Sequence, residues 1–431
     1  MDITSLYGGI RPLIDGVTVS NDTRVTLLNN NDMIIGPTGA GKTGGYVIPN
    51  LMTCRGSVIV ADTKGNLQRT LGPSLRARGY EIHKVDFIHP EDSDAYDPFD
   101  YIDRNERTGR LREQDVMTIA RAIVTGLDSK EPFWEQSART VTACLIAYIK
   151  DVFPAEEQNL NTLSELFRLM VHEYTDSKRA NSSAPVIPFL EEYMLACPDS
   201  FVAQKYGMFK NVIAAEKTWA CITQFISAAI DVFDFEEAKQ MFGAPRTFRF
   251  EDLGRRKIAL FLNISDTDRT LDKMADLFYT QAIQALCREA DRQPDSRLRV
   301  PVRIILDDFA TNAFIPDFDK VISVIRSREI SVSVILQSLT QLEAMYNKPA
   351  ATTIVNNCDH ILYLGGHDPG TAEYISSYAN MPLEKILCMP VGKACLISRG
   401  SRAVIGDRIR PYSYDTAPPA PAQDEETEAT L

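Results

Sequence analysis

The sequence predicts an α/β protein with a mostly parallel β-sheet whose two sheet-forming parts are separated by an all-α domain. Three observations carry this prediction. Short apolar runs alternate with loop and helix patterns up to residue 102, helical periodicity fills residues 103–245, and the alternation resumes in residues 246–414. Such alternation is typical of βαβ units, which build parallel sheets. We therefore expect one discontinuous α/β domain around an all-α insertion, with residues 415–431 as a tail.

Strand-sized apolar runs define the first part of the expected sheet. They cover residues 33–35, 58–60 and 82–87, and a loop or helix pattern follows each of them. This order places successive strands side by side with crossover connections, as in a parallel sheet.

Apolar side chains recur at helical spacing in the middle of the chain. The clearest stripes are Val116, Ile119, Ala120 and Ile123, then Trp134, Ala138, Val141 and Leu145, then Leu163, Leu166, Phe167 and Met170. We interpret the aromatic residues Phe133, Trp134 and Trp219 as part of a helical core and not as a ligand-binding surface.

After residue 246 the sequence predicts the rest of the sheet. Strands are expected at residues 257–264, 302–308, 330–336 and 361–364, with a helix at residues 271–289. The last residues, 415–431, hold three prolines, five acidic residues and no basic residue, which is typical of a disordered acidic tail. Such a tail either increases solubility or binds a basic partner.

The charge balance excludes a generally basic nucleic-acid coat protein. The chain holds 58 acidic and 46 basic residues, and its net charge is −12. A narrow channel lined by Lys and Arg is compatible with this balance, because it needs only local positive charge.

No apolar run approaches the roughly 18 residues of a membrane span, and no secretory signal is found. Eight scattered cysteines without a Cys-x-x-Cys pair indicate reduced thiols in a cytoplasmic protein.

A phosphate-binding loop is the strongest functional signal. The stretch GPTGAGKT fits the pattern GxxxxGK[ST] and follows the predicted strand 33–35. Its glycines let successive backbone N–H groups form an anion-binding nest, Lys42 reaches the β- and γ-phosphates, and the Thr43 hydroxyl binds Mg²⁺. We therefore predict a site for ATP and Mg²⁺. Its nucleotide-binding residues are Gly36, Pro37, Thr38, Gly39, Ala40, Gly41, Lys42 and Thr43.

Two acidic residues close the predicted strand 302–308. In a nucleotide-hydrolysing site the first acid, Asp307, serves the Mg²⁺ ion, and the second, Asp308, activates the attacking water. Efficient enzymes of this kind usually carry Glu at the second position. Asp308 is one methylene shorter, so we expect slow hydrolysis unless the backbone compensates.

An arginine pair precedes the predicted strand 330–336. A helical stripe in residues 318–325 ends at Arg326-Ser327-Arg328, and Gln337 closes the strand that follows. Gln337 is placed to sense the γ-phosphate, and an arginine of this pair to act as a finger offered to a neighbouring subunit. The alternative is that arginines at a helix C-terminus only complement the helix dipole.

With these motifs on hand, the chain resembles the TraG/TraD-like coupling proteins of conjugative type IV secretion. The matching stretches, in the family's order, are GPTGAGKT, VIVADTKGN, DPFDYI, LDDFATNAFIPDFDKVISVIRSREISVSVILQSLTQLEAMY and IVNNCDHILYLGG. The long block is far more specific than the phosphate-binding loop. The resemblance implies a RecA-like P-loop motor domain with a parallel-rich sheet, interrupted by an all-α domain and assembled as a homo-hexamer.

The resemblance also implies a function and partners. The ring would hydrolyse ATP, recruit a relaxase–DNA complex and move single-stranded DNA to the components of a type IV secretion channel. The all-α domain would help to select this cargo. The nucleotide would lie between subunits. The residues implied are Lys42, Thr43, Asp307 and Asp308 from one subunit, with the sensor Gln337, and Arg326 from the next.

Three features depart from the family pattern. Members usually begin with two membrane spans, and here none is found, so the chain is a soluble branch of the family, docks on a membrane partner, or is a truncated form. We expect a cytoplasmic protein that is recruited to the membrane face. Asp308 stands where Glu is usual. Asn66 stands where an acid is common, although Asp62 and Lys64 are kept, and Lys64 is either a surface charge or a phosphate contact.

Two other functions stay open on this evidence. The first is a nucleotide-gated adaptor, in which the all-α domain and tail bind a relaxase or effector and turnover is negligible. Asp308 and the missing membrane spans favour it. The second is a receptor for effector proteins that uses the same ring without DNA.

Overall fold

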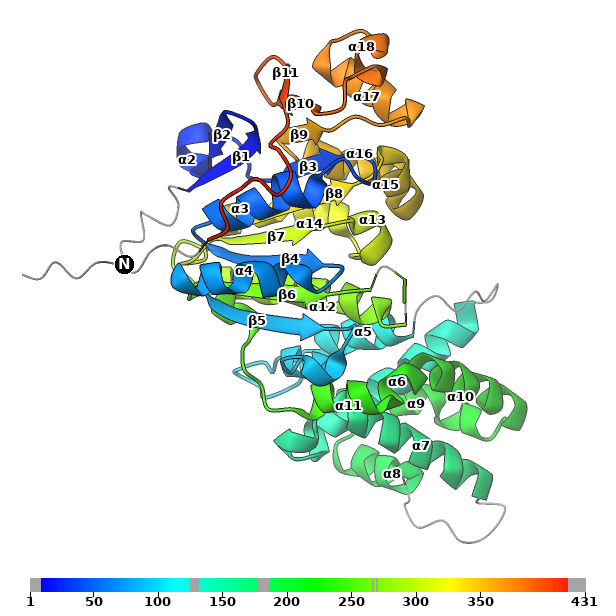
Figure 1. Ribbon diagram of the computed structural model, residues 1–431. Helices are drawn as coiled ribbons and strands as arrows, with labels where there is room; N and C mark the ends of the chain where they lie inside the picture. Colours follow the sequence, from blue (N-terminus) through cyan, green and yellow to red (C-terminus); the bar gives the residue numbers. More distant parts are fainter. Residues whose placement is uncertain (1–8, 125–131, 177–185, 266, 269, 418–431) are drawn as a thin grey trace, which may run out of the picture.

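The computed structural model contains a nine-stranded sheet with helices on both faces and a further group of helices at one end (Figure 1). It describes residues 9–124, 132–176, 186–265, 267–268 and 270–417. The strand order is β11-β10-β9-β3-β8-β7-β4-β6-β5. The predicted α/β class is confirmed.

Parallel strands make up most of this sheet, and two antiparallel strands extend one edge. The parallel strands are β9 (His360–Tyr363), β3 (Asp32–Ile35), β8 (Ile330–Leu336), β7 (Val302–Leu306), β4 (Ser57–Asp62), β6 (Ile258–Asn263) and β5 (Glu81–Asp86). The antiparallel strands are β10 (Lys393–Ser398) and β11 (Val404–Asp407). The sequence predicts all of the parallel strands but neither antiparallel one. Strand β11 has only four residues and none of them is buried, and the buried apolar run 394–397 of β10 is not recognised as a strand.

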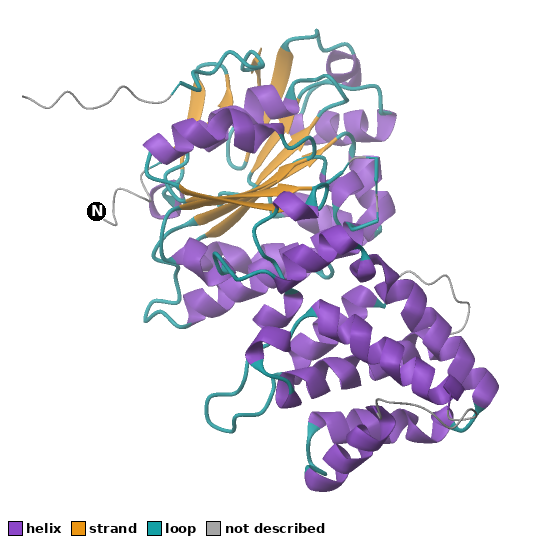
Figure 2. Ribbon diagram, turned by 60° about the horizontal axis from the view of Figure 1, so that its bottom comes forward, coloured by secondary structure: helices purple, strands orange, loops and turns teal. Residues whose placement is uncertain are grey.

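Helices pack on both faces of the sheet (Figure 2). One face is covered by η1 (Thr43–Val47), α3 (Ile48–Thr53) and α4 (Asn66–Ala77). The other is covered by α12 (Asp272–Asp291), α13 (Phe309–Asn312), α14 (Phe318–Val324), α15 (Leu339–Tyr346) and α16 (Lys348–Asn356), with α17 (Pro369–Ala379) and α18 (Leu383–Leu387) beside them. Strands buried on both faces read as near-continuous apolar runs, which explains why the sequence revealed them.

The all-helical part lies between β5 and β6 in the chain and at one end of the sheet in space (Figure 1). Its helices are α5 (Glu113–Ile123), α6 (Pro132–Val152), α7 (Leu160–Asp176), α8 (Val186–Ala196), α9 (Phe201–Ile213), α10 (Glu216–Ile230) and α11 (Glu236–Gly243). Trp219 is fully buried beside Phe209, as expected of a core residue. The same expectation is wrong for Phe133, which is 52% exposed. Neighbouring residues on a helix point about 100° apart, so Trp134 packs inward while Phe133 faces outward.

Asp97 connects the all-helical part to the sheet-forming part. Its buried carboxyl group accepts hydrogen bonds from the backbone N–H groups of Phe99 and Leu160, both at 2.8 Å. Burial raises the pKa of Asp97 to about 7. The apolar core also continues from the sheet into the helices. The domain limits proposed from the sequence, at residues 102/103 and 245/246, remain a prediction.

A hairpin that the sequence analysis did not identify precedes β3. It consists of β1 (Ile10–Ile14) and β2 (Val17–Ser20), and the short helix α2 (Thr23–Thr26) follows it. Arg11 is buried and forms an ion pair with Asp32 at 2.8 Å. Burial alone would raise the pKa of Asp32, but Arg11 and Arg303 outweigh it and lower the pKa. This pair attaches the hairpin to the start of β3.

Two further expectations concern the membrane and the tail. Within the described ranges, no helix combines the length and apolar character that crossing a membrane requires. Residues 418–431 of the predicted acidic tail lie outside the described residues.

Candidate nucleotide-binding site

The predicted phosphate-binding loop follows β3 at the carboxyl edge of the sheet. The N–H of Gly36 donates to the carbonyl oxygen of Leu336 at 3.1 Å, which extends the pairing of β3 with β8 into the loop. Gly39 and Gly41 have φ angles of +81° and +82°, which glycine adopts far more readily than other residues. The loop then enters η1 at Thr43. Gly39 and Gly41 therefore occupy positions whose backbone conformation calls for glycine.

Lys42 is folded back onto this loop. Its Nζ donates to the carbonyl oxygens of Gly36 at 2.8 Å and Pro37 at 3.3 Å. The same atom lies 3.7 Å from Oδ1 of Asp308, and the side chain is only 7% exposed. A phosphate entering the loop would replace these carbonyls as the partner of the ammonium group.

Thr43 and Asp307 are in direct contact although they lie far apart in the sequence. The Thr43 hydroxyl donates to Oδ2 of Asp307 at 2.7 Å, although 264 positions separate them. Burial raises the pKa of Asp307 to about 6; Asp308 adds to this effect, whereas Thr43 and Lys42 oppose it. A hydroxyl and a carboxylate oxygen are hard ligands of the kind that Mg²⁺ prefers. This pair therefore fits the predicted magnesium ligands.

Asp308 follows Asp307 in a strained turn. Its φ angle of +48° is uncommon for a residue with a side chain. Its N–H donates to Oδ1 of Asp307 at 3.1 Å. This turn brings the short second acid into the same cavity as Lys42.

These side chains share a cavity of about 550 Å³. The loop forms one wall, the end of β4 and the start of α4 form the second, and a segment after β11 forms the third. The lining includes Thr38, Gly39, Gly41, Lys42, Thr43, Gly44, Asp62, Thr63, Lys64, Asn66, Asp307, Asp308, Pro411 and Tyr412. The volume, the anion-binding nest and the paired oxygen ligands fit a nucleoside triphosphate with Mg²⁺.

The wall after β4 clarifies two residues of the sequence analysis. The carboxylate of Asp62 accepts hydrogen bonds from the N–H groups of Asn66, Leu67 and Gln68, at 3.1, 2.7 and 3.2 Å. The carboxylate therefore caps the N-terminus of α4, and its oxygens are engaged by the backbone N–H groups of that helix. Lys64 is exposed and lines the cavity, where it can contact phosphate.

Pro411 and Tyr412 are site residues that the sequence reasoning missed. They belong to no recognisable motif and lie far from the loop in sequence. Only their packing against the loop identifies them.

Gln337 and Arg326 lie at opposite ends of strand β8, and therefore at opposite ends of the parallel strands of the sheet. Gln337 directly follows β8, whose Leu336 pairs with Ile35, so it lies beside the start of the loop but outside the cavity lining. Arg326 precedes β8, in the short helix η7 (Ile325–Arg328). Because β8 has seven residues, roughly 20 Å of strand separates the two ends.

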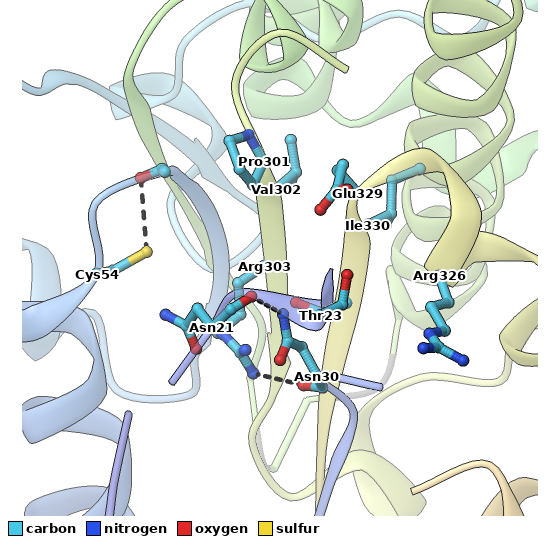
Figure 3. Close-up of a pocket in the computed structure, with 12 residues that line it drawn as sticks. Asn21, Thr23, Asn30, Cys54, Pro301, Val302, Arg303, Arg326, Glu329 and Ile330 are labelled. Carbon is cyan, nitrogen blue, oxygen red and sulfur yellow. Dashed lines mark hydrogen bonds between the residues drawn. The ribbon is translucent and has the colours of Figure 1, made fainter. Parts of the chain in front are cut away.

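Figure 3 shows Arg326 at the rim of a small recess on the amino edge of the sheet. Its side chain is exposed and donates to the carbonyl oxygen of Leu27 at 3.3 Å. Arg328, in contrast, forms an ion pair with Asp291 at 2.9 Å. Arg326 is therefore the more available arginine, but it cannot reach the nucleotide cavity of its own chain.

Comparison with known proteins adds a family to this geometry. A model of the family described as type IV secretory system conjugative DNA transfer matches residues 9–379. Protein VirD4 of Agrobacterium fabrum is 22% identical over 379 residues, which is 86% of this chain and 53% of VirD4. VirD4 of Rhizobium rhizogenes is 21% identical over 351 residues, 80% of this chain and 48% of that protein. The chain thus spans about half the length of the curated relatives it matches.

Solved structures share the fold. The plasmid coupling protein TrwB in complex with a non-hydrolysable ATP analogue has a TM-score of 0.67 at 13% identity, covering 95% of this chain and 91% of TrwB. TrwB with ADP and Mg²⁺ has a TM-score of 0.61 at 12% identity, covering 94% and 90%. VirB4 of Thermoanaerobacter pseudethanolicus reaches 0.54 at 13% identity, covering 94% and 96%.

Proposed function

The chain belongs to the family of type IV secretory system conjugative DNA transfer proteins, and from this premise we propose that it is a coupling ATPase of a conjugative type IV secretion system. In this proposal ATP hydrolysis in a hexameric ring recruits a relaxase–DNA complex and moves single-stranded DNA to the transfer channel. The protein acts at the cytoplasmic face of the membrane, next to channel components or a membrane-anchored partner.

The hydrogen bond between Thr43 and Asp307 is the observation that carries the proposal. It joins the phosphate-binding loop to the acid pair after β7, and Lys42 and Asp308 lie in the same cavity. TrwB, which shares this fold, has been solved with ADP and Mg²⁺ and with an ATP analogue.

Each of these side chains has a distinct role in the proposed hydrolysis. Loop N–H groups and the Lys42 ammonium bind the phosphates and offset their negative charge. Thr43 and Asp307 would hold Mg²⁺, which when bound would offset the negative charge of the phosphates. Asp308 accepts the proton of the attacking water. Gln337, beside the loop, senses whether the γ-phosphate is present.

Arg326 completes the site from a neighbouring subunit. It lies at the amino edge of the sheet, opposite its own cavity, so it acts on a nucleotide only when a second copy presents its cavity to that edge. This geometry favours a ring in which each nucleotide lies between two subunits.

Steady-state ATP hydrolysis with and without single-stranded DNA tests the function. We expect DNA to stimulate turnover, and Lys42→Ala to abolish both turnover and nucleotide binding because the phosphates lose their buried cation. Asp308→Asn is the sharper variant. It should lower kcat by about 100-fold or more while nucleotide affinity stays nearly unchanged, because only the proton acceptor is removed.

Two outcomes would contradict the motor. Tight Mg–ATP binding without turnover in the presence of DNA would support the nucleotide-gated adaptor, an alternative favoured by the short side chain of Asp308. Turnover that responds to a protein cargo but not to DNA would support a receptor for effector proteins.

A further inference from the structure

The segment after β11 crosses the phosphate-binding loop and is fixed to it at several points. In Figure 1 this red segment descends from β11 past α3 toward α4. Arg408 donates through Nη1 to the carbonyl oxygen of Ala40, inside the loop. The N–H of Tyr412 donates to the carbonyl oxygen of Gly44 at 3.2 Å. Further along, the Ser74 hydroxyl of α4 donates to the carbonyl oxygen of Thr416.

Glycines in and after the loop make this approach possible. A Cβ atom on Gly41 would lie 2.4 Å from Cγ of Pro411, and one on Gly44 would lie 2.9 Å from Cε2 of Tyr412. A Cβ atom on Gly45 would lie 2.7 Å from the carbonyl oxygen of Ile409. None of these distances leaves room for a side chain. The segment is therefore packed directly against the backbone of the nucleotide site.

Tyr412 is held in an unusual position within this segment. One edge of its ring rests on Gly44, yet the residue is 74% exposed and lines the nucleotide cavity. Its φ angle is +58°, which costs a residue with a side chain roughly 1–2 kcal/mol. A large aromatic ring is thus presented to the cavity in a strained conformation instead of being buried in the core.

The position of the phosphates indicates what this ring can contact. Lys42, Thr43 and Asp307 set the phosphate end of the cavity, and Gly44 is the next residue after Thr43. A nucleotide with its phosphates on the loop must send its base outward from that end. Flat bases bind to aromatic rings by stacking, which is tolerant of base identity.

We propose that Tyr412 is the base-stacking residue of the nucleotide site and that it forms the third wall of this site together with Pro411. This proposal rests on the proposed function. The phosphates are recognised by the loop, and the base by the ring. Recognition by stacking predicts that the site accepts both purines, ADP and GDP, and binds pyrimidine nucleotides more weakly because their ring is smaller.

Calorimetric binding of two ligands to the full chain tests this proposal. Mg–ADP has a base, whereas Mg–tripolyphosphate offers only phosphates. Tyr412→Asn removes the ring but suits the positive φ angle, since Asn tolerates this conformation. We expect it to weaken Mg–ADP about ten-fold and to leave Mg–tripolyphosphate unchanged. Tyr412→Phe should bind both ligands as the unsubstituted chain does.

A spectroscopic readout avoids dependence on affinity alone. Tyr412→Trp adds an indole to a chain with two tryptophans, and the difference from the unsubstituted chain reports on position 412. We expect Mg–ADP to quench this added fluorescence and Mg–tripolyphosphate to leave it unchanged. For the calorimetric experiment, Tyr378→Asn is the matched control for Tyr412→Asn, because Tyr378 is an exposed aromatic residue on α17 outside the cavity lining. It should leave the binding of both ligands unchanged.

The outcomes separate this proposal from the proposed function. If Tyr412→Asn weakens both ligands equally, the segment only braces the loop, and stacking is wrong. If it changes neither ligand while Lys42→Ala loses both, the nucleotide site stands and Tyr412 has no part in it. If the unsubstituted chain binds neither ligand, both proposals fail.

Discussion

At the residue scale, Lys42 and Thr43 of the proposed nucleotide site already have hydrogen-bond partners within the protein. Lys42 donates to two loop carbonyls, and Thr43 donates to Asp307. In the proposed function, binding would therefore be an exchange of partners: phosphate oxygens would replace the carbonyls at Lys42, and Thr43 and Asp307 would give up their mutual hydrogen bond to hold Mg²⁺. Such an exchange limits the cost of keeping a buried ammonium and a buried carboxylate in one cavity.

The loop glycines provide a prediction with a built-in control. Gly39 and Gly41 both have positive φ angles, so alanine at either position causes similar backbone strain. Only at Gly41 does the new Cβ atom also collide, 2.4 Å from Pro411, whereas nothing lies within 4 Å at Gly39. Gly41→Ala should therefore lower the free energy of unfolding by about 1–3 kcal/mol more than Gly39→Ala.

Urea denaturation of the two variants measures this difference. Equal destabilisation would mean that Pro411 does not pack on the loop in solution. That result would also remove the third wall of the nucleotide site.

At the element scale, hydrogen bonds around His83 hold the edge strand β5. His83 on this strand contacts Glu81 at 2.8 Å and Asp94 at 3.3 Å. Asp94 in turn accepts from the Thr247 hydroxyl at 2.9 Å, where the chain returns from the helical insertion. Burial alone would lower the pKa of His83, but the hydrogen bonds to Asp94 and Glu81 outweigh it and raise the pKa.

This raised pKa gives a pH-dependent contribution to stability. The protonated imidazole is favoured in the folded state, so its stabilisation is fully present below the ordinary pKa of about 6.5 and is lost as pH rises through the raised value. His83→Gln should therefore reduce the free energy of unfolding more at pH 5.5 than at pH 8.5. Denaturation at both pH values checks this, with His89→Gln at a mostly exposed site as the control. A pH-independent loss would show that His83 acts by packing.

At the scale of the whole molecule, parallel strands separate Arg326 from the cavity it is proposed to serve. In parallel strands all carboxyl ends lie on one side of the sheet and all amino ends on the other. Arg326 precedes the amino end of β8, whereas the loop follows the carboxyl end of β3, so the two lie on opposite sides. The finger can work only between copies. Isolated chains should therefore hydrolyse ATP slowly, with turnover per chain rising as copies assemble.

Mixing two inactive variants tests this arrangement. Lys42→Ala cannot bind nucleotide but still offers Arg326, and Arg326→Ala keeps an intact cavity. Each should be inactive alone, and a mixture should regain part of the activity because an intact cavity meets an intact arginine. Arg328→Ala, which loses the pair with Asp291, should keep most of its turnover. Absence of recovery in mixtures that co-assemble would argue against a finger in trans.

Much of the site could be predicted because its parts follow strands of one parallel sheet. Thr43 follows β3 and Asp307 follows β7, and the carboxyl ends of parallel strands meet at one edge. Tyr412 could not be predicted in this way, since it follows an antiparallel edge strand and no motif surrounds it. The role of Asp62 as a helix cap was equally hidden, because a capping carboxylate and a catalytic one look alike in sequence.

Local patterns in the sequence were enough to predict the α/β class, which the structure confirms, and the helices between β5 and β6. They also predicted that the glycine-rich loop follows β3 and that the acid pair follows β7, as the structure places them. These features depend on periodicity and on turns of a few residues, which the chain encodes locally. The ion pair of Arg11 with Asp32, the separation of Arg326 from the cavity and the placement of Tyr412 beside Gly44 emerged from the folded chain. Each of these depends on packing between segments distant in sequence, and such packing follows from the shape of the whole core.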